Sequence, residues 1–129
     1  MVLREGNGKD FPVAGNIVTC HYTGWLNNQQ GKNFESSDPG KPFVFTIGIG
    51  QVIKCWDEGV VTMSVGEKAT LTCSPEYGYG DEDVGSVIPS NSTLCFEIEL
   101  LKIDLVSNST ARSSNVLPLF SVKRMFWYI

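Results

Sequence analysis

Alternation of apolar and polar residues restricts the fold of this chain more than any other feature of its sequence. In residues 15–26 (GNIVTCHYTGWL), Val18, Cys20 and Tyr22 fall on one side of an extended chain and the residues between them on the other. The same pattern returns in residues 43–47, 67–74 and 92–103. A period of two is that of a β-strand with one buried face. The sequence therefore predicts four strands, and the last two should bury Ala69, Leu71, Cys73, Leu94, Phe96, Ile98 and Leu100.

The period changes to that of a helix between residues 51 and 63. Trp56, Val60 and Met63 are spaced as on one face of a helix, and acidic residues occupy the opposite face. This pattern predicts one short amphipathic helix. Strands with a single helix packed across them form an α+β fold, here an antiparallel sheet.

Length and composition favour a single domain. The 129 residues suffice to bury one core without metals or disulfides. No apolar run is long enough to span a bilayer, and the first eleven residues lack the features of a signal peptide. We therefore expect a monomeric protein in the cytoplasm.

The cysteine and histidine content argues against metals and disulfides. In a compartment where thiols stay reduced, Cys20, Cys55, Cys73 and Cys95 should be four free thiols. With one His and no CxxC pair, the sequence predicts neither a metal site nor any other cofactor.

The charge distribution excludes some partners. All 14 acidic residues lie within residues 1–104, whereas three of the 10 basic residues lie beyond them. Such an acidic body repels a phosphate backbone, and no basic stripe interleaved with aromatic residues offsets this. Neither nucleic acid nor a membrane is an expected partner.

Aromatic residues are more numerous than a core of this size needs. Residues 75–89 add a long loop, rich in Gly and Pro, of a kind that usually serves a function. Periodicity alone leaves open whether the aromatic residues form only a core or also line a ligand pocket. The aromatic residues in question are Tyr22, Phe34, Phe43, Phe45, Trp56, Tyr77, Tyr79 and Phe96.

Six motifs, in order and spacing, resemble the family of FKBP-type peptidyl-prolyl cis/trans isomerases. They cover about 104 residues, and so many matches are far more specific than one short pattern. The motifs are VTCHYTGWL (18–26), KNFESS (32–37), KPFVFTIG (41–48), QVIKCWDEGVVTMSVGEKA (51–69), SPEYGYG (74–80) and VIPSNSTLCFEIELLKI (87–103).

The resemblance implies a five-stranded antiparallel sheet wrapped around the short helix, with a pocket between them. Trp56 would form the pocket floor, and Glu35 would lie at its rim. The Ile53 N–H and the Tyr79 hydroxyl would donate hydrogen bonds to ligand carbonyls. The implied catalytic residues are Tyr22, Phe34, Glu35, Trp56, Tyr79 and Phe96, and the substrate- or inhibitor-binding set adds Phe43, Val52, Ile53 and Ile88.

The same resemblance implies an activity and partners. Family members rotate Xaa-Pro peptide bonds and bind macrolides such as tacrolimus and rapamycin. Their drug-bound surface can engage calcineurin or the TOR kinase. Two further readings stay open for this chain, a module that binds proline motifs without turnover and a carrier of small apolar ligands.

The sequence departs from the family at three places within residues 1–104. Glu35 replaces the usual Asp, which we expect to weaken macrolide binding more than turnover. Cys55 replaces the usual Gly, either as a neutral substitution or as a thiol made reactive by the helix N-terminus. The loop of residues 81–86 (DEDVGS) is unusually acidic, which puts the calcineurin or TOR interaction in doubt.

Residues 105–129 have no counterpart in minimal members of the family. Their composition predicts a flexible extension, with or without a role of its own. One hypothesis is that Leu117-Pro118-Leu119 competes for the pocket of this chain or of a neighbour. Another is that the apolar residues 125–129 dock on a partner or membrane surface.

Overall fold

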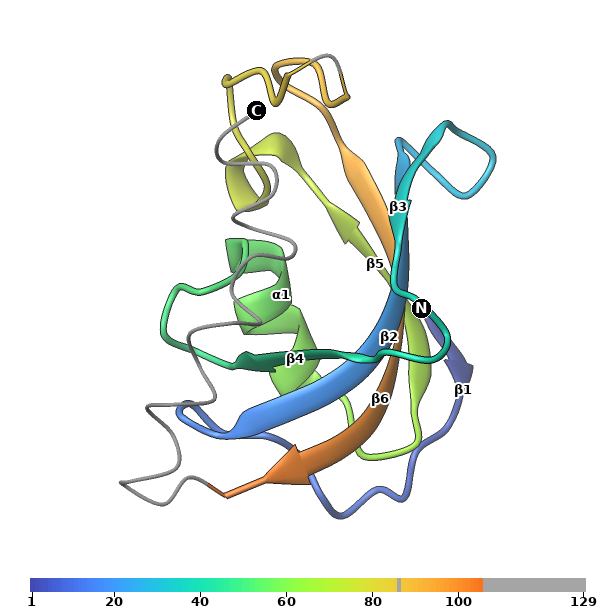
Figure 1. Cartoon of the computed structure of the whole chain (residues 1–129), viewed down its shortest axis with the longest axis vertical. Helices are drawn as coiled ribbons and strands as arrows, with labels where there is room; N and C mark the ends of the chain where they lie inside the picture. The colour runs from blue at the N-terminus through green and yellow to red at the C-terminus, as the bar shows by residue number, and fades with distance from the viewer. Residues whose placement is uncertain (86, 106–129) are drawn as a thin grey trace.

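A computed structural model describes residues 1–85 and 87–105, and its strands form one antiparallel sheet. Its elements are β1 (Val2–Arg4), β2 (Ile17–Leu26), β3 (Asn33–Ser36), β4 (Phe43–Thr46), α1 (Lys54–Gly59), the 3-10 turn η1 (Val60–Thr62), β5 (Lys68–Cys73), the 3-10 turn η2 (Pro75–Tyr77) and β6 (Leu94–Asp104). The sheet runs in the order β1-β5-β6-β2-β3, and β4 also pairs with β2. It curves around α1, which lies on its concave side (Figure 1). The predicted α+β class, with an antiparallel sheet wrapped around one short helix, is confirmed.

Alternation correctly identified the buried face of the sheet. Along β2, Val18, Cys20 and Tyr22 are buried and the residues between them are half-buried. The inward set of β6 is fully buried, and in β5 Ala69 and Cys73 are buried while Leu71 is only partly so. β2 and β6 are neighbours at the centre of the sheet, and their buried faces form one wall of the core.

Three parts of the fold differ from the sequence-based expectation. The strand β3 lies in the turn-rich residues 27–42, where alternation predicts no strand. The helix α1 covers six residues rather than most of residues 51–63, because the chain tightens into η1 at Val60 and becomes extended at Met63. Trp56, Val60 and Met63 are nevertheless buried, since the tighter turn keeps them on one side. The strand β1 was not predicted, because its three exposed residues show no alternation of burial.

The expectation of four free thiols is wrong. Cys55 and Cys73 form a disulfide whose Cα atoms lie 5.6 Å apart, while Cys20 and Cys95 are free and buried. The helix places Cys55 against the end of β5, where Cys73 faces inward, a separation that suits a disulfide. The hypothesis that Cys55 is a reactive free thiol is therefore wrong for this structure.

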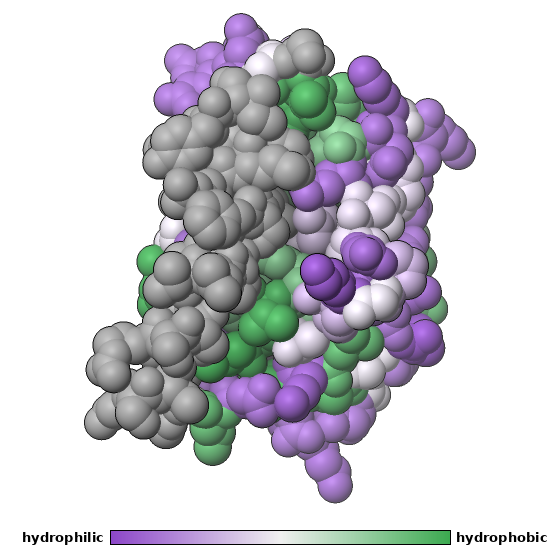
Figure 2. All heavy atoms as spheres, in the orientation of Figure 1, coloured by the Kyte–Doolittle hydropathy of each residue, from purple (hydrophilic) through white to green (hydrophobic). Residues whose placement is uncertain are grey.

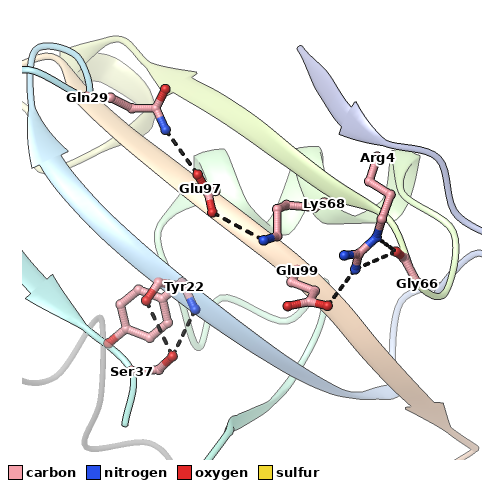
Figure 3. Close-up of polar contacts among 8 residues, drawn as sticks. All are labelled: Arg4, Tyr22, Gln29, Ser37, Gly66, Lys68, Glu97 and Glu99. Carbon is pink, nitrogen blue, oxygen red and sulfur yellow. Dashed lines mark hydrogen bonds and ion pairs between the residues drawn. The ribbon is translucent and has the colours of Figure 1, made fainter. Parts of the chain in front are cut away.

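The convex side of the sheet is polar. Arg4 from β1 donates to Glu99 on β6, and Lys68 on β5 pairs with Glu97 at 3.8 Å (Figure 3). Ser37 contacts the backbone of Tyr22, accepting from its N–H at 2.9 Å (Figure 3). These contacts occupy the face that turns away from α1, so an apolar ligand site belongs on the concave side.

The described residues contain no helix long and apolar enough to cross a membrane. Apart from Leu105, which is exposed, the predicted extension at residues 105–129 lies outside the described residues. The hypotheses about Leu117-Pro118-Leu119 and about residues 125–129 lie outside them as well.

Candidate ligand-binding site

Trp56 lies at the centre of a cluster of aromatic rings on the concave side of the sheet. Its ring centroid is 5.0 Å from that of Tyr22, 5.3 Å from Phe96, 5.6 Å from Phe45 and 5.7 Å from Phe43. Most of these pairs meet edge to face, the arrangement that aromatic quadrupoles favour. Trp56 is fully buried, and its indole N–H has no hydrogen-bond partner within residues 1–85 and 87–105. The helix therefore places Trp56 at the centre of a packed apolar cluster.

Phe34 on β3 extends the aromatic cluster towards the surface. Its ring is 5.6 Å from that of Phe96, and the two planes are perpendicular. Gly24 on β2 leaves room for both rings, because a Cβ at this position would lie 2.7 Å from Phe34 and 2.8 Å from Phe96. Phe34 is half-buried, so it can offer one face to a bound molecule.

Three polar groups gather beside the aromatic rings. The Tyr22 hydroxyl donates a hydrogen bond to the Glu35 carboxylate, and the Tyr79 hydroxyl interacts electrostatically with the same carboxylate. Burial raises the pKa of Glu35 to about 7, although the hydrogen bond from Tyr22 opposes this rise. Burial, and then the Glu35 charge, raise the pKa values of both tyrosines, which therefore stay protonated and can act as donors.

A groove of about 450 Å³ runs past the start of α1. Val52, Ile53 and Tyr79 line its apolar part. Its charged lining residues are Lys54, Asp57, Glu76, Asp81 and Glu82. Ile53 is buried, and its N–H has no acceptor in the described part of the chain. A buried unpaired N–H carries a free-energy penalty, which a ligand carbonyl placed here would relieve.

A turn that sequence reasoning missed holds the start of α1 in place. The two Asp57 carboxylate oxygens accept hydrogen bonds from the Gly48 and Gly50 N–H groups at 2.8 and 2.9 Å. Both glycines have positive φ angles, which side chains disfavour. The Gly-x-Gly spacing before the helix is the signal that could have indicated this anchoring role.

The structure brings most of the predicted site residues together. Ring contacts or electrostatic interactions link seven of them, namely Tyr22, Phe34, Glu35, Phe43, Trp56, Tyr79 and Phe96. Val52 and Ile53 line the same groove as Tyr79. Ile88 is buried in the same core. Tyr77 does not join the cluster, since it is exposed and the Lys54 ammonium lies 5.2 Å from its ring centroid. Phe45, which was not assigned to the site, is buried against Trp56 and stacks on Phe43.

Apolar surface remains visible on one face of the molecule. Figure 2 shows hydrophobic atoms through the middle of that face, bordered by hydrophilic atoms. Within residues 1–85 and 87–105, no three His, Cys, Asp or Glu side chains are grouped as metal ligands would be. The described aromatic rings and hydrogen-bond donors can bind an apolar segment and orient its carbonyls.

Comparison with known proteins places this site in context. Residues 8–101 match the family model of FKBP-type peptidyl-prolyl cis-trans isomerases. A peptidyl-prolyl cis-trans isomerase of Schizosaccharomyces pombe is 58% identical over 104 residues, which are 80% of this chain and 91% of the relative. FK506-binding protein 1 of Rhizopus delemar is 53% identical over 103 residues, or 79% of this chain and 94% of the relative. Peptidyl-prolyl cis-trans isomerase Fkbp12 of Drosophila melanogaster is 54% identical with the same coverage.

Proposed function

This chain belongs to the family of FKBP-type peptidyl-prolyl cis-trans isomerases, and we propose that its aromatic site accelerates rotation about Xaa-Pro peptide bonds. The observation that carries the proposal is the buried aromatic cluster around Trp56, together with the nearby Ile53 N–H, which has no acceptor among the described residues. An apolar floor suits a proline ring, and the donor suits the carbonyl of a neighbouring residue. The same surface suits tacrolimus-type macrolides, in line with relatives named FK506-binding protein.

The reaction needs no nucleophile. Its barrier of about 18–20 kcal/mol is the loss of amide resonance as the C–N bond twists. The twisted amide is less polar in its C–N unit than the planar one, so an apolar site favours it relative to water. Binding is then stronger in the transition state than in the ground state, which is the condition for catalysis.

Each predicted site residue has a role in this proposal. Trp56, Phe96 and Tyr22 exclude water from the proline ring, and Phe34 closes the side of the site. The Ile53 N–H and the Tyr79 hydroxyl fix the peptide in a bent shape, which lowers the entropic part of the barrier. Glu35 lies beside both tyrosines and keeps their hydroxyl groups oriented. Phe43, Val52 and Ile88 complete the apolar wall.

Isomerisation of a Leu-Pro-Phe peptide, measured with and without tacrolimus, tests the proposal. The isomerase reading requires turnover that the drug abolishes. Binding of peptide and drug without turnover would leave the second reading, a module that binds proline motifs. If the chain binds apolar dyes but neither the peptide nor the drug, the third hypothesis, a carrier of small apolar ligands, is favoured.

We also propose protein partners and a cellular location for this chain. Calcineurin and the TOR kinase are the proposed partners of the drug-bound surface, and the acidic residues 81–83 set a charge that these partners must accommodate. Co-precipitation of each kind of partner in the presence of tacrolimus or rapamycin tests this. A monomer in the cytoplasm remains our expectation, to be checked by sedimentation and by imaging of the tagged chain.

A further inference from the structure

The Cys55–Cys73 disulfide joins the two segments that carry the hydrogen-bond donors of the site. Cys55 directly precedes Trp56 in α1 and follows Ile53 by two residues. Cys73 ends β5, and the chain then runs through η2 to Tyr79. Cleaving this bond would remove the covalent link between the Ile53 side and the Tyr79 side of the site.

The disulfide can be reached from solvent through a second groove. This groove, of about 540 Å³, is bordered by residues of α1 and β5, and Cys55, Gly59, Leu71 and Tyr77 are among the residues that line it. Cys55 is 9% exposed and Cys73 is 1% exposed. A small thiol can therefore approach Cys55, whereas Cys73 is shielded.

We propose that Cys55–Cys73 is a thiol–disulfide exchange site that couples the redox state of the surroundings to the order of the Xaa-Pro site. The reductant is a small dithiol, or two monothiols. The link to catalysis rests on the proposed function, while the exchange chemistry stands on the disulfide and its groove alone.

The exchange balances as a two-electron reduction. A reductant thiolate attacks Cys55 Sγ, the Cys55–Cys73 bond breaks, and the Cys73 thiolate takes a proton from water. The second thiol then attacks the mixed disulfide and releases Cys55, which is also protonated. The protein gains two thiols, and the reductant becomes a disulfide.

The two remaining cysteines cannot take over the link. Cys20 on β2 lies opposite Leu100, whereas Cys95 on β6 lies opposite Trp25, several residues further along the same ladder. Both are buried, and burial raises the pKa of each thiol, so both are poor nucleophiles.

The short helix makes the site sensitive to this bond. A helix of six residues is not stable by itself, and α1 has no side-chain hydrogen bond at its N-cap. Its contact with β5 rests on the disulfide and on the close approach of Gly59 to Leu71. Reduction should therefore loosen α1 more than β6, which pairs with strands on both sides.

The test equilibrates the full chain at graded ratios of reduced to oxidised dithiothreitol. Alkylation after denaturation, followed by mass spectrometry, should count two free thiols at the oxidising end and four at the reducing end. Reduction should lower the melting temperature by about 10 °C or more. It should also accelerate hydrogen exchange at the Trp56 and Asp57 amides about tenfold more than in β6.

Peptide binding by the same samples tests whether the redox state of the disulfide affects the Xaa-Pro site. Reduction should weaken binding of a Leu-Pro-Phe peptide about threefold or more, because fewer molecules hold the competent arrangement. Cys55→Ala should show the reduced-state values in every buffer, and the matched control Cys95→Ala should keep the full redox response.

Two results would overturn the proposal. One is a count of four thiols at every ratio, and the other is equal exchange of the α1 amides in both redox states. If the peptide fails to bind in either state, the proposed function is wrong, while the thiol count and the α1 exchange still decide the redox proposal. Since the wild-type chain provides both of these readouts, poor folding of a variant does not affect the decision.

Discussion

At the scale of single residues, the site combines fully buried aromatic rings with one carboxylate that resists ionisation. Glu35 Oε1 is buried and has no hydrogen-bond partner among the described residues, although the Tyr22 hydroxyl donates a hydrogen bond to the same carboxylate. Desolvation outweighs that hydrogen bond, so the pKa of Glu35 rises from 4.5 to about 7. A family resemblance located this residue, but the sequence could not give its burial.

The raised pKa of Glu35 predicts a specific dependence of stability on pH. Between about 4.5 and 7 the folded chain keeps a proton on Glu35 that the unfolded chain releases. This contribution to stability is complete below pH 4.5 and is lost as the pH rises through 7. Gln cannot titrate, so the melting temperature of the wild type should fall relative to that of Glu35→Gln as the pH rises from 4.5 to 7. Parallel curves for the two proteins would show that Glu35 ionises normally.

Substitution of Gly24 by Ala tests how tightly the rings of Phe34 and Phe96 are packed. The added methyl group of Gly24→Ala would meet Phe34 and Phe96 at less than 3 Å, and flat rings cannot bend away. We expect a loss of about 1–3 kcal/mol of stability, together with weaker peptide binding. Gly40→Ala is the matched control, because its nearest atom, Asp38 Oδ1, is 3.8 Å away. Equal stability of the two variants in denaturant titrations would contradict the described packing.

At the scale of elements, alternation sufficed to predict β2, β5 and β6, because each of these strands buries one face. It could not predict β1, which is exposed throughout, or β3, whose four residues show no alternation of burial. It also missed the early end of α1, since η1 keeps the same apolar spacing. The Cys55–Cys73 bond was missed for a different reason. The compartment argument set the expectation, and a sequence does not report the distance between a helix and a strand.

The turn between β4 and α1 should depend on Asp57. Asp57→Ala removes both acceptors of the Gly48 and Gly50 N–H groups. We expect a loss of about 1–3 kcal/mol, since hydrogen bonds to a charged group are involved, and weaker binding because Val52 and Ile53 follow this turn. Glu58→Ala serves as the neighbouring control. Unchanged stability and affinity in Asp57→Ala would show that the turn holds without this anchor.

At the scale of the whole molecule, every predicted site residue lies within the described residues 1–85 and 87–105, in the sheet, in α1 or in the segments that connect them. We propose that residues 1–104 fold as the isomerase domain and that residues 105–129 are an appendage. A chain ending at Asp104 should then keep the melting temperature of the full chain to within a few degrees.

The same truncation tests the hypothesis that Leu117-Pro118-Leu119 competes with substrate. Between Asp104 and Leu117 an extended chain spans at most about 43–47 Å, enough to return to the site. If the segment competes, the shortened chain should bind a test peptide more tightly and turn it over faster at low peptide concentration. Identical apparent affinities, by calorimetry, would exclude the competition.

The central claim is that one aromatic site both binds macrolides and twists Xaa-Pro bonds. The most direct measurement is the rate of cis-to-trans conversion of a Leu-Pro-Phe peptide during titration of the full chain with tacrolimus. The account predicts that the catalysed rate falls linearly and reaches the uncatalysed rate at one equivalent of drug. Turnover that persists when the drug is bound, or drug binding by a chain that never accelerates the conversion, would contradict it.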